Sequence, residues 1–420
     1  METKTYNEGK NNNLLKTYLP TASFANFGIY ISLLTPVLVS MAYKVEHITH
    51  SKSAATNALG LVLGVGAFFA LIVNPIVGRL SDRTTSKFGM RRPWLIGGVL
   101  LGFLGFVLIA TASSIPMVVI GWSVAQTGMN GALATFNATI PDQVTEEKRG
   151  VVSGIVGMML PAGVLLGSIL VAGISSDVPR FLVPASIAVV SVLLFAFMLK
   201  DRVLTEKPST PFNFKTLIST FYFNPKQHPD FGWVVLTKFI FMTGYIGIAT
   251  YLPFFLQDRF NLAEKSALPV ITLSNMISQV LLAVASAFGG ILSDKLGKRK
   301  PLVMVAGVVV AIGLVVLALA PNVTMVIVAQ AIIGLGTGAF FSVDLALATL
   351  TLPNPEESAK DLGVYNIANA LAQTIAPIIA PAIIAMGAGL AIGGYATFYL
   401  LGAVLVLTGS LAITKVKSVK

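Results

Sequence analysis

The sequence predicts an all-α membrane protein of about twelve transmembrane helices, arranged as two pseudo-symmetric six-helix bundles. Three observations predict this class: a 55% hydrophobic composition with a mean hydropathy of +0.81, long apolar stretches at regular intervals, and a polar segment that occurs once in each half. Only 11% of the 420 residues are charged, against about a quarter in soluble domains. Water therefore cannot be the main solvent of this chain.

Long apolar stretches recur along the chain, with short polar segments between them. A helix needs about 20 apolar residues to cross the hydrocarbon core of a bilayer. The predicted spans are residues 20–43, 54–77, 94–112, 115–140, 151–174, 181–199, 231–256, 267–291, 301–320, 323–350, 363–387 and 394–414. The polar residues before the first span lack an apolar core followed by a cleavage site, so we expect no removable signal peptide.

The chain offers few groups for metal or covalent chemistry. It contains no cysteine, which excludes thiol catalysis, disulfides and thiolate metal sites. All three histidines, His47, His50 and His228, fall in expected loops, which argues against a histidine metal cluster or an intramembrane proton relay. We therefore expect no cofactor, no metal site and no enzyme activity.

The position of the Lys and Arg residues explains the net charge of +11. Of the 29 Lys and Arg residues, 23 fall on one side of the predicted spans, and Lys238 lies within a span. Five fall on the opposite side: Lys44, Lys52, Arg180, Arg259 and Lys265. Since basic loops stay in the cytoplasm, we expect a multi-pass protein of the cell membrane, embedded in its lipid bilayer, with both termini cytoplasmic and no nucleic-acid partner.

The longest polar connection, residues 200–230, divides the predicted spans six and six. Residues 78–93, GRLSDRTTSKFGMRRP, recur as residues 289–301, GGILSDKLGKRKP. Because six spans separate the two copies, both face the same side, as in parallel repeats about an axis along the membrane normal. The expected domains are an N-terminal bundle of residues 1–199, a cytoplasmic linker of residues 200–230 and a C-terminal bundle of residues 231–420.

The repeated loop carries residues suited to a reversible contact between the halves. Glycine permits close backbone approach, aspartate accepts hydrogen bonds or faces a helix N-terminus, and arginine donates in a bidentate manner. The alternative is a basic loop that only satisfies the cytoplasmic bias and holds its own turn. The expected latch residues are Gly78, Asp82, Arg83, Arg91 and Arg92 in the first copy and Asp294, Lys295 and Arg299 in the second.

The pattern G-x-L-S-D-R/K followed by G-x-R-R/K-P, present twice, resembles the signature loop of the major facilitator superfamily. Residues 32–36, SLLTP, and residues 81–94, SDRTTSKFGMRRPW, more narrowly resemble the glycoside-pentoside-hexuronide cation symporters and the sucrose/proton symporters. The resemblance implies the major facilitator fold, alternating access and cation-coupled sugar uptake. Plant sucrose carriers have an aspartate and an arginine where this chain has Gln126 and Asn137.

Polar side chains inside the spans follow helical spacing. Hydrocarbon cannot satisfy them, so they should face the bundle interior or a water-filled cavity. Amides and phenols suit the hydroxyl groups of a neutral polyol, whereas for any single amide the alternative is a hydrogen bond that holds two helices together. The candidate substrate-binding residues are Asn26, Tyr30, Gln126, Asn130, Asn137, Tyr245, Asn275, Gln279, Tyr365, Asn366, Asn369 and Gln373.

Lys238 and Asp344 are the two ionisable residues expected inside spans. Each costs about 2.5 to 3.5 kcal/mol at bilayer depth. Both lie about 10 Å from the cytoplasmic end of their spans, so the two side chains can meet. In the family resemblance their helices line the central cavity, and we expect the pair to couple transport to an ion. The alternative is a static ion pair or a snorkelling lysine.

These patterns lead to a cation-coupled symporter that imports a sugar or glycoside, with a proton as the first choice of ion and another monovalent cation as the second. The segment GLGTG at 334–338 lacks the Lys-Ser/Thr of a phosphate-binding loop, so we expect an ion gradient to drive transport. A proton-driven exporter of drugs or metabolites is the alternative if the cavity is mainly apolar. A membrane-embedded enzyme or a channel is the alternative from another class, and a channel should lack the duplicated latch.

Overall fold

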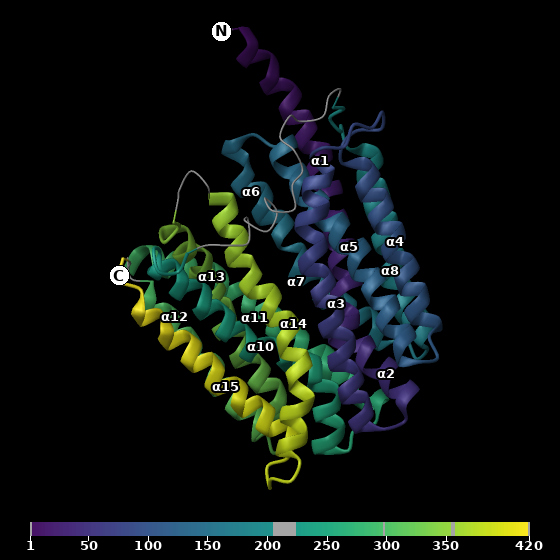
Figure 1. Ribbon diagram of the computed structural model, residues 1–420, viewed down its shortest axis with the longest axis vertical. Helices are drawn as coiled ribbons and strands as arrows, with labels where there is room; N and C mark the ends of the chain where they lie inside the picture. Colours follow the sequence, from purple (N-terminus) through teal and green to yellow (C-terminus); the bar gives the residue numbers. More distant parts are fainter. Residues whose placement is uncertain (1, 205–223, 297–298, 354–357, 419–420) are drawn as a thin grey trace. The chain divides into compact units, whose positions relative to one another are not determined.

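The computed structural model describes residues 2–204, 224–296, 299–353 and 358–418, and in these ranges all regular structure is helical (Figure 1). Side chains are described in the same ranges except for residues 2–15, 294, 296, 345 and 358–362. The predicted all-α class is therefore confirmed.

The helices follow one another with short connections. They are α1 Glu2–Thr35, α2 Met41–Thr49, α3 Lys52–Ser81, α4 Arg92–Thr111, α5 Ile115–Gln143, α6 Glu146–Gly157, α7 Met159–Ala172, α8 Asp177–Met198, α10 Pro229–Phe260, α11 Glu264–Leu296, α12 Lys300–Ala318, α13 Val323–Leu350, α14 Ser358–Gly387 and α15 Gly394–Ala412, with a π-helix at Pro36–Ser40 and a 3-10 helix at Ile413–Lys415. Proline stands in the first turn of α4, α5, α10 and α12, where its missing N–H removes no intrahelical hydrogen bond.

Within the described residues, 11 helical segments are long and apolar enough to cross a membrane. They match every predicted span except residues 115–140. That span corresponds to α5, which is 29 residues long but carries three side-chain amides, Gln126, Asn130 and Asn137. These amides lower the hydropathy of α5. With α5 counted by its length, each predicted span corresponds to a helical segment.

The first span is longer than predicted. Residues 20–43 were expected to end before Lys44, but the helical path continues from α1 through the π-helix and α2 to Thr49. Pro36 has no N–H to donate within the helix, and the chain widens there into a π-turn instead of ending. Lys44 is consequently a buried residue of α2, with 5% of its surface exposed, and His47 lies in the same helix.

The predicted spans 151–174 and 181–199 also need correction. The first is divided into α6 and α7, which meet at Met158. The second begins earlier, so Arg180 lies in the first turn of α8, where it is buried and its Nε donates to the carbonyl oxygen of Ile174 at 2.5 Å. Hydropathy assigned Arg180 to a loop because a charge ends an apolar window even where the helix continues.

The helices form two compact units. Unit 1 contains residues 1–40 and 69–212, and unit 2 contains residues 41–68 and 213–420. The predicted linker 200–230 stays a prediction, since residues 205–223 lie outside the described part of the chain. Residues 41–68 belong to unit 2 through contacts such as the 2.8 Å hydrogen bond between the hydroxyls of Thr56 and Tyr395.

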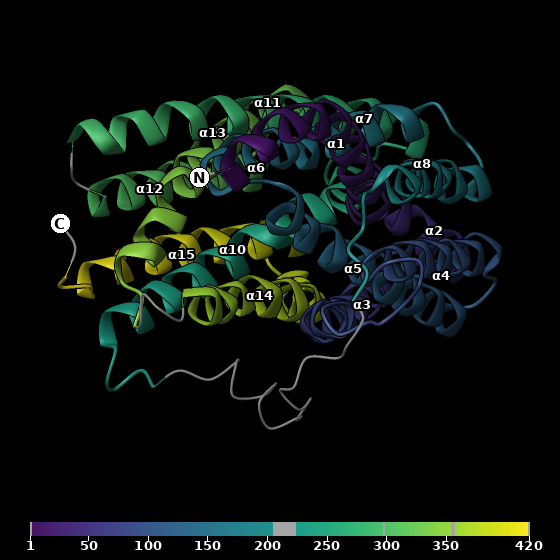
Figure 2. The same cartoon turned by 90° about the horizontal axis from the view of Figure 1, so that it is seen from above.

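Each unit has its own packing pattern. In unit 1, α4 packs against α5 and α8, while α1 packs against α8 and α7. In unit 2, α13 packs between α11 and α12, and α10 packs against α14 and α15, as the view along the helices shows (Figure 2). Buried side chains between these helices form the core of each unit.

Glycines allow α4 and α5 to pack backbone against backbone. A Cβ added at Gly105 would lie 2.3 Å from the nitrogen of Ala125, and one added at Gly128 would lie 2.2 Å from the nitrogen of Gly102. Helices in a membrane associate through such close packing because lipid provides no hydrophobic driving force between them. These glycines therefore fix the distance between α4 and α5.

We predict that Gly128→Ala lowers the stability of the protein, because the added methyl group would overlap the backbone of α4. Overpacking of this kind costs about 1–3 kcal/mol, which thermal unfolding in detergent would register as a lower Tm. Gly97→Ala is the matched control, since a Cβ at Gly97 meets no atom within 4 Å. An unchanged Tm for Gly128→Ala would contradict the assigned role of this contact.

Candidate functional site

In unit 2 a buried ion pair joins α10 to α13. The Lys238 Nζ and the Asp344 Oδ2 are 3.1 Å apart, and the side chains are 11% and 8% exposed. On α14, the Tyr365 ring lies under the Lys238 ammonium, with 3.6 Å between the Nζ and the ring centroid. A cation over an aromatic face is stabilised by the ring quadrupole, more strongly when water is excluded.

The three side chains meet because their helices end on the same side of unit 2. Lys238 lies within about three turns of the start of α10, Asp344 within about two turns of the end of α13, and Tyr365 within about two turns of the start of α14. An unpaired charge at this depth would cost about 2.5–3.5 kcal/mol. Pairing, with the aromatic ring, makes this burial tolerable.

An aromatic stripe continues from the ion pair along α10 and α13. Phe241 stacks on Phe340 with 3.7 Å between ring centroids and 5° between planes. One turn further, Tyr245 meets Phe341 edge to face at 6.4 Å. Lys238, Phe241 and Tyr245 share one face of α10 by their helical spacing. The sequence analysis selected Tyr245 but missed the two phenylalanines, which look like ordinary apolar residues of a span.

The predicted binding residues of unit 1 are partly engaged in holding the unit together. The Asn26 Nδ2 donates to the carbonyl oxygen of Val156 at 3.0 Å, which ties α1 to α6. On α5 the Asn130 Nδ2 donates to the Gln126 Oε1 at 2.6 Å. Tyr30 is half-buried and Asn137 is exposed. Asn26 therefore matches the structural alternative, whereas the α5 amides contact each other.

The predicted binding residues of unit 2 have different surroundings. Tyr365 contacts the ion pair. On α11, Asn275 is buried and Gln279 is half-buried. On α14, Asn369 is half-buried, and Asn366 and Gln373 are exposed. Their part in substrate binding stays a prediction.

In unit 1 the repeated loop surrounds one buried arginine. The Arg91 Nη1 lies 2.5 Å from the Asp82 Oδ1, and its Nε lies 2.8 Å from the Asp142 Oδ2. Its Nη1 also donates to the Ser81 Oγ at 2.6 Å. Burial by itself would lower the pKa of the Arg91 guanidinium, but hydrogen bonds and charge from Asp142 and Asp82 raise it. The arginine thus joins the ends of α3, α4 and α5.

A second carboxylate, Asp201, fixes the turn before α4. Its Oδ2 accepts the backbone N–H groups of Arg91 at 2.8 Å and Arg92 at 2.7 Å. The Arg92 side chain donates to the carbonyl oxygens of Ala196 and Leu199, both at 2.7 Å, and so holds the end of α8. Gly89, with φ +103°, is required here because a Cβ would collide with the Asp201 carboxylate.

The second copy of the loop is described in part. The Arg299 Nη1 donates to the carbonyl oxygen of Ala346 at 3.1 Å, and the Lys300 ammonium donates to that of Val416. Lys295 is exposed, and the Asp294 side chain lies outside the described residues. Each copy therefore has a basic residue that holds the last helix of its own unit, Arg92 on α8 and Lys300 beyond α15.

The sequence analysis missed four of these contacts: those of Ser81, Asp142, Asp201 and Lys300. The available signal was the position of Asp142 and Asp201 directly after spans, opposite an arginine-rich loop. One expectation was wrong: a Cβ at Gly78 would meet no atom within 4 Å, so no close backbone approach occurs there. Whether the loop latches the two halves together stays a prediction, as does any part in it for Arg83.

We predict that Arg91→Lys destabilises the protein, because a lysine ammonium cannot contact Asp82 and Asp142 with the planar fork of a guanidinium. A loss of about 1–3 kcal/mol is expected for a hydrogen bond to a charged group left unmade, and thermal unfolding would detect it. Arg202→Lys, the same change at an exposed arginine, should leave the Tm unchanged. Equal Tm values for both variants would contradict a central role of Arg91.

Solved structures and characterised relatives share this architecture. The crystal structure of a nucleoside transporter superposes with a TM-score of 0.78 over 96% of this chain and 99% of that chain, at 13% identity. The tetracycline resistance protein, class H, of Pasteurella multocida is 30% identical over 281 residues, which are 64% of this chain and 65% of that protein. A sucrose transport protein of Arabidopsis thaliana is 31% identical over 97 residues, 23% of this chain and 16% of that protein. The matches thus span less than two thirds of these two relatives.

The family model described as Major Facilitator Superfamily matches residues 21–282 and 270–418. These two matches include both copies of the repeated loop, the Arg91 cluster of unit 1 and the ion pair of unit 2. The superposed structure shows the same fold at a sequence identity too low to indicate a substrate. The chain therefore belongs to the Major Facilitator Superfamily and is a membrane transporter, not an enzyme.

Proposed function

We propose that the protein is a proton-coupled symporter that imports a sugar or glycoside by alternating access. The observation that carries this proposal is the buried contact of Lys238, Asp344 and Tyr365. A titratable carboxylate inside a membrane helix is costly, and such residues mark proton or ion pathways. The ammonium partner gives Asp344 two arrangements, paired while ionised and released while protonated, between which a transport cycle can alternate.

The substrate class follows from the side chains along the spans. Tyr245, Tyr365 and the amides of α5, α11 and α14 offer directed donors and acceptors together with aromatic faces. These groups match the hydroxyl groups and the ring face of a sugar. The alignment with a sucrose transport protein supports the same class, although it covers only 23% of this chain.

A proton-driven exporter of drugs or metabolites is the second candidate. It is favoured by the longer alignment with the tetracycline resistance protein, 281 residues against 97, and by the aromatic stripe of Phe241, Phe340 and Phe341. Both candidates use the same ion pair and differ in the direction of substrate movement. Proteoliposomes with a proton gradient of either sign distinguish them, because a symporter accumulates substrate on the side to which protons flow.

The distribution of Lys and Arg leads us to propose that both termini are cytoplasmic in the cell membrane. We predict that reporters fused after Lys420, or inserted in residues 200–230, report cytoplasm, since basic loops resist translocation. A reporter inserted next to Lys265, in the connection before α11, should give the opposite signal and is the matched control. An external signal from the C-terminal fusion would overturn this orientation.

We predict that Asp344→Asn abolishes uphill accumulation of substrate, because the amide keeps the shape of the side chain but cannot bind and release a proton. Exchange of substrate down its own gradient should survive. Substrate-induced proton movement in proteoliposomes is the measurement. Asp258→Asn, the same change at an exposed carboxylate of α10, is the control and should accumulate substrate normally. If Asp344→Asn retains accumulation and proton movement, the ion pair is structural.

A further inference from the structure

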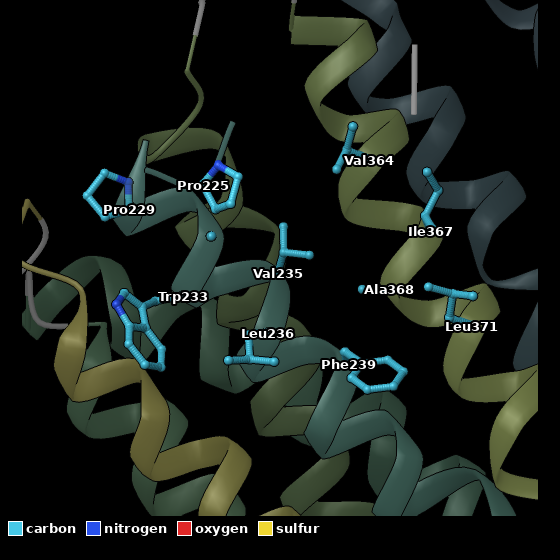
Figure 3. Close-up of a pocket in the computed structure, with 11 residues that line it drawn as sticks. Pro225, Pro229, Trp233, Val235, Leu236, Phe239, Val364, Ile367, Ala368 and Leu371 are labelled. Atoms are coloured by element: carbon cyan, nitrogen blue, oxygen red, sulfur yellow. The ribbon is translucent and has the colours of Figure 1, made fainter. Parts of the chain in front are cut away.

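An apolar groove runs between the first turns of α10 and α14 in unit 2 (Figure 3). Its volume is about 580 Å³. The principal side chains along it are Trp233, Leu236 and Phe239 from α10 and Val364, Ile367 and Leu371 from α14. Leu236 and Leu371 are exposed, so the groove opens to the outside of unit 2.

One end of this groove differs from the rest. Pro225 and Pro229 lie there, beside Trp233, where the α10 span begins (Figure 3). Tryptophan is enriched at the membrane–water interface, because its ring is apolar and its N–H is polar. The groove therefore starts at the headgroup level and continues along membrane-spanning helices.

Lysines gather around this end. Lys226 is exposed and directly follows Pro225. Asp230, at the start of α10, accepts the backbone N–H groups of Lys417 at 2.9 Å and Ser418 at 2.7 Å, which brings the C-terminal segment and the exposed Lys417 to the same place. Lys300, bonded to the carbonyl oxygen of Val416, adds a further positive charge near Asp230.

A second apolar groove, in unit 1, provides an internal comparison. It lies between α1 and α8, is lined by residues including Phe24, Leu182 and Val190, and has a volume of about 490 Å³. Its lining starts at Val178, directly after the acidic Asp177. The two grooves are alike in size and lining, but lysines surround the end of the α10–α14 groove.

We propose that the α10–α14 groove binds an anionic phospholipid, with one acyl chain between α10 and α14 and the phosphate against Lys226 and Lys417. An apolar channel of this length suits an alkyl chain, and lysines near a membrane surface attract anionic headgroups. The same turns of α10 and α14 carry Lys238 and Tyr365. A bound lipid would thus hold these turns at a fixed spacing.

Quenching of Trp233 fluorescence by brominated phospholipids tests this proposal. The protein contains three tryptophans, and the double variant Trp94→Phe/Trp122→Phe leaves Trp233 as the reporter. The purified full-length chain is reconstituted in phosphatidylcholine vesicles that contain the same small mole fraction of brominated phosphatidylglycerol or brominated phosphatidylcholine. If the double variant does not fold, the difference in quenching between the unmodified protein and Trp233→Phe gives the same information.

We expect brominated phosphatidylglycerol to quench Trp233 at a lower mole fraction than brominated phosphatidylcholine. Lys226→Gln and Lys417→Gln should each weaken this preference about fivefold, the ratio that corresponds to about 1 kcal/mol per lysine. Lys265→Gln, at the far end of α10, is the matched control and should keep the preference. Equal quenching by both lipids would overturn the proposal, as would no quenching by either, which would mean that protein covers the groove.

Discussion

Hydrocarbon offers no hydrogen bonds, so every polar group that this chain carries into the bilayer must find its partner inside the protein. The backbone meets this constraint by forming helices throughout the described spans. The charged side chains meet it by pairing, as Lys238 and Asp344 do. Both the fold and the site follow from this constraint, since a charge inside a membrane persists only where another element supplies its counterpart.

The same constraint explains how each unit holds its helices. Unit 1 uses backbone contact at glycines between α4 and α5, and the Arg91 guanidinium where α3, α4 and α5 end. Glycine contacts act within the hydrocarbon, where only packing is available. The arginine acts at the helix ends, where carboxylates and backbone groups can surround it. The two kinds of contact thus divide the length of the helices between them.

The ion pair of unit 2 has features of a group that changes partners during transport. It is buried, it joins α10 and α13, and an aromatic residue of a third helix covers it. Breaking a buried pair is costly while both partners are charged. Protonation of the carboxylate removes that cost, which is how a proton can be linked to a movement of these helices. The neighbouring groove lies along the same turns of α10 and α14, so a lipid there would act on the same helices.

The sequence by itself determined the helical class, the spans, the duplicated loop and the two residues of the ion pair, because hydropathy, repetition and a charge in an apolar stretch are local properties. Only the tertiary structure decided which groups meet. Asp142 and Asp201 stand 51 and 110 positions from Arg91, and no pattern of spacing links them to it. Tertiary packing also placed Lys44 and Arg180 in helices, and it gave Asn26 a partner in α6. The physical reason is that a polar side chain in a membrane is satisfied by whichever helix lies beside it, and only the folded chain decides which helix that is.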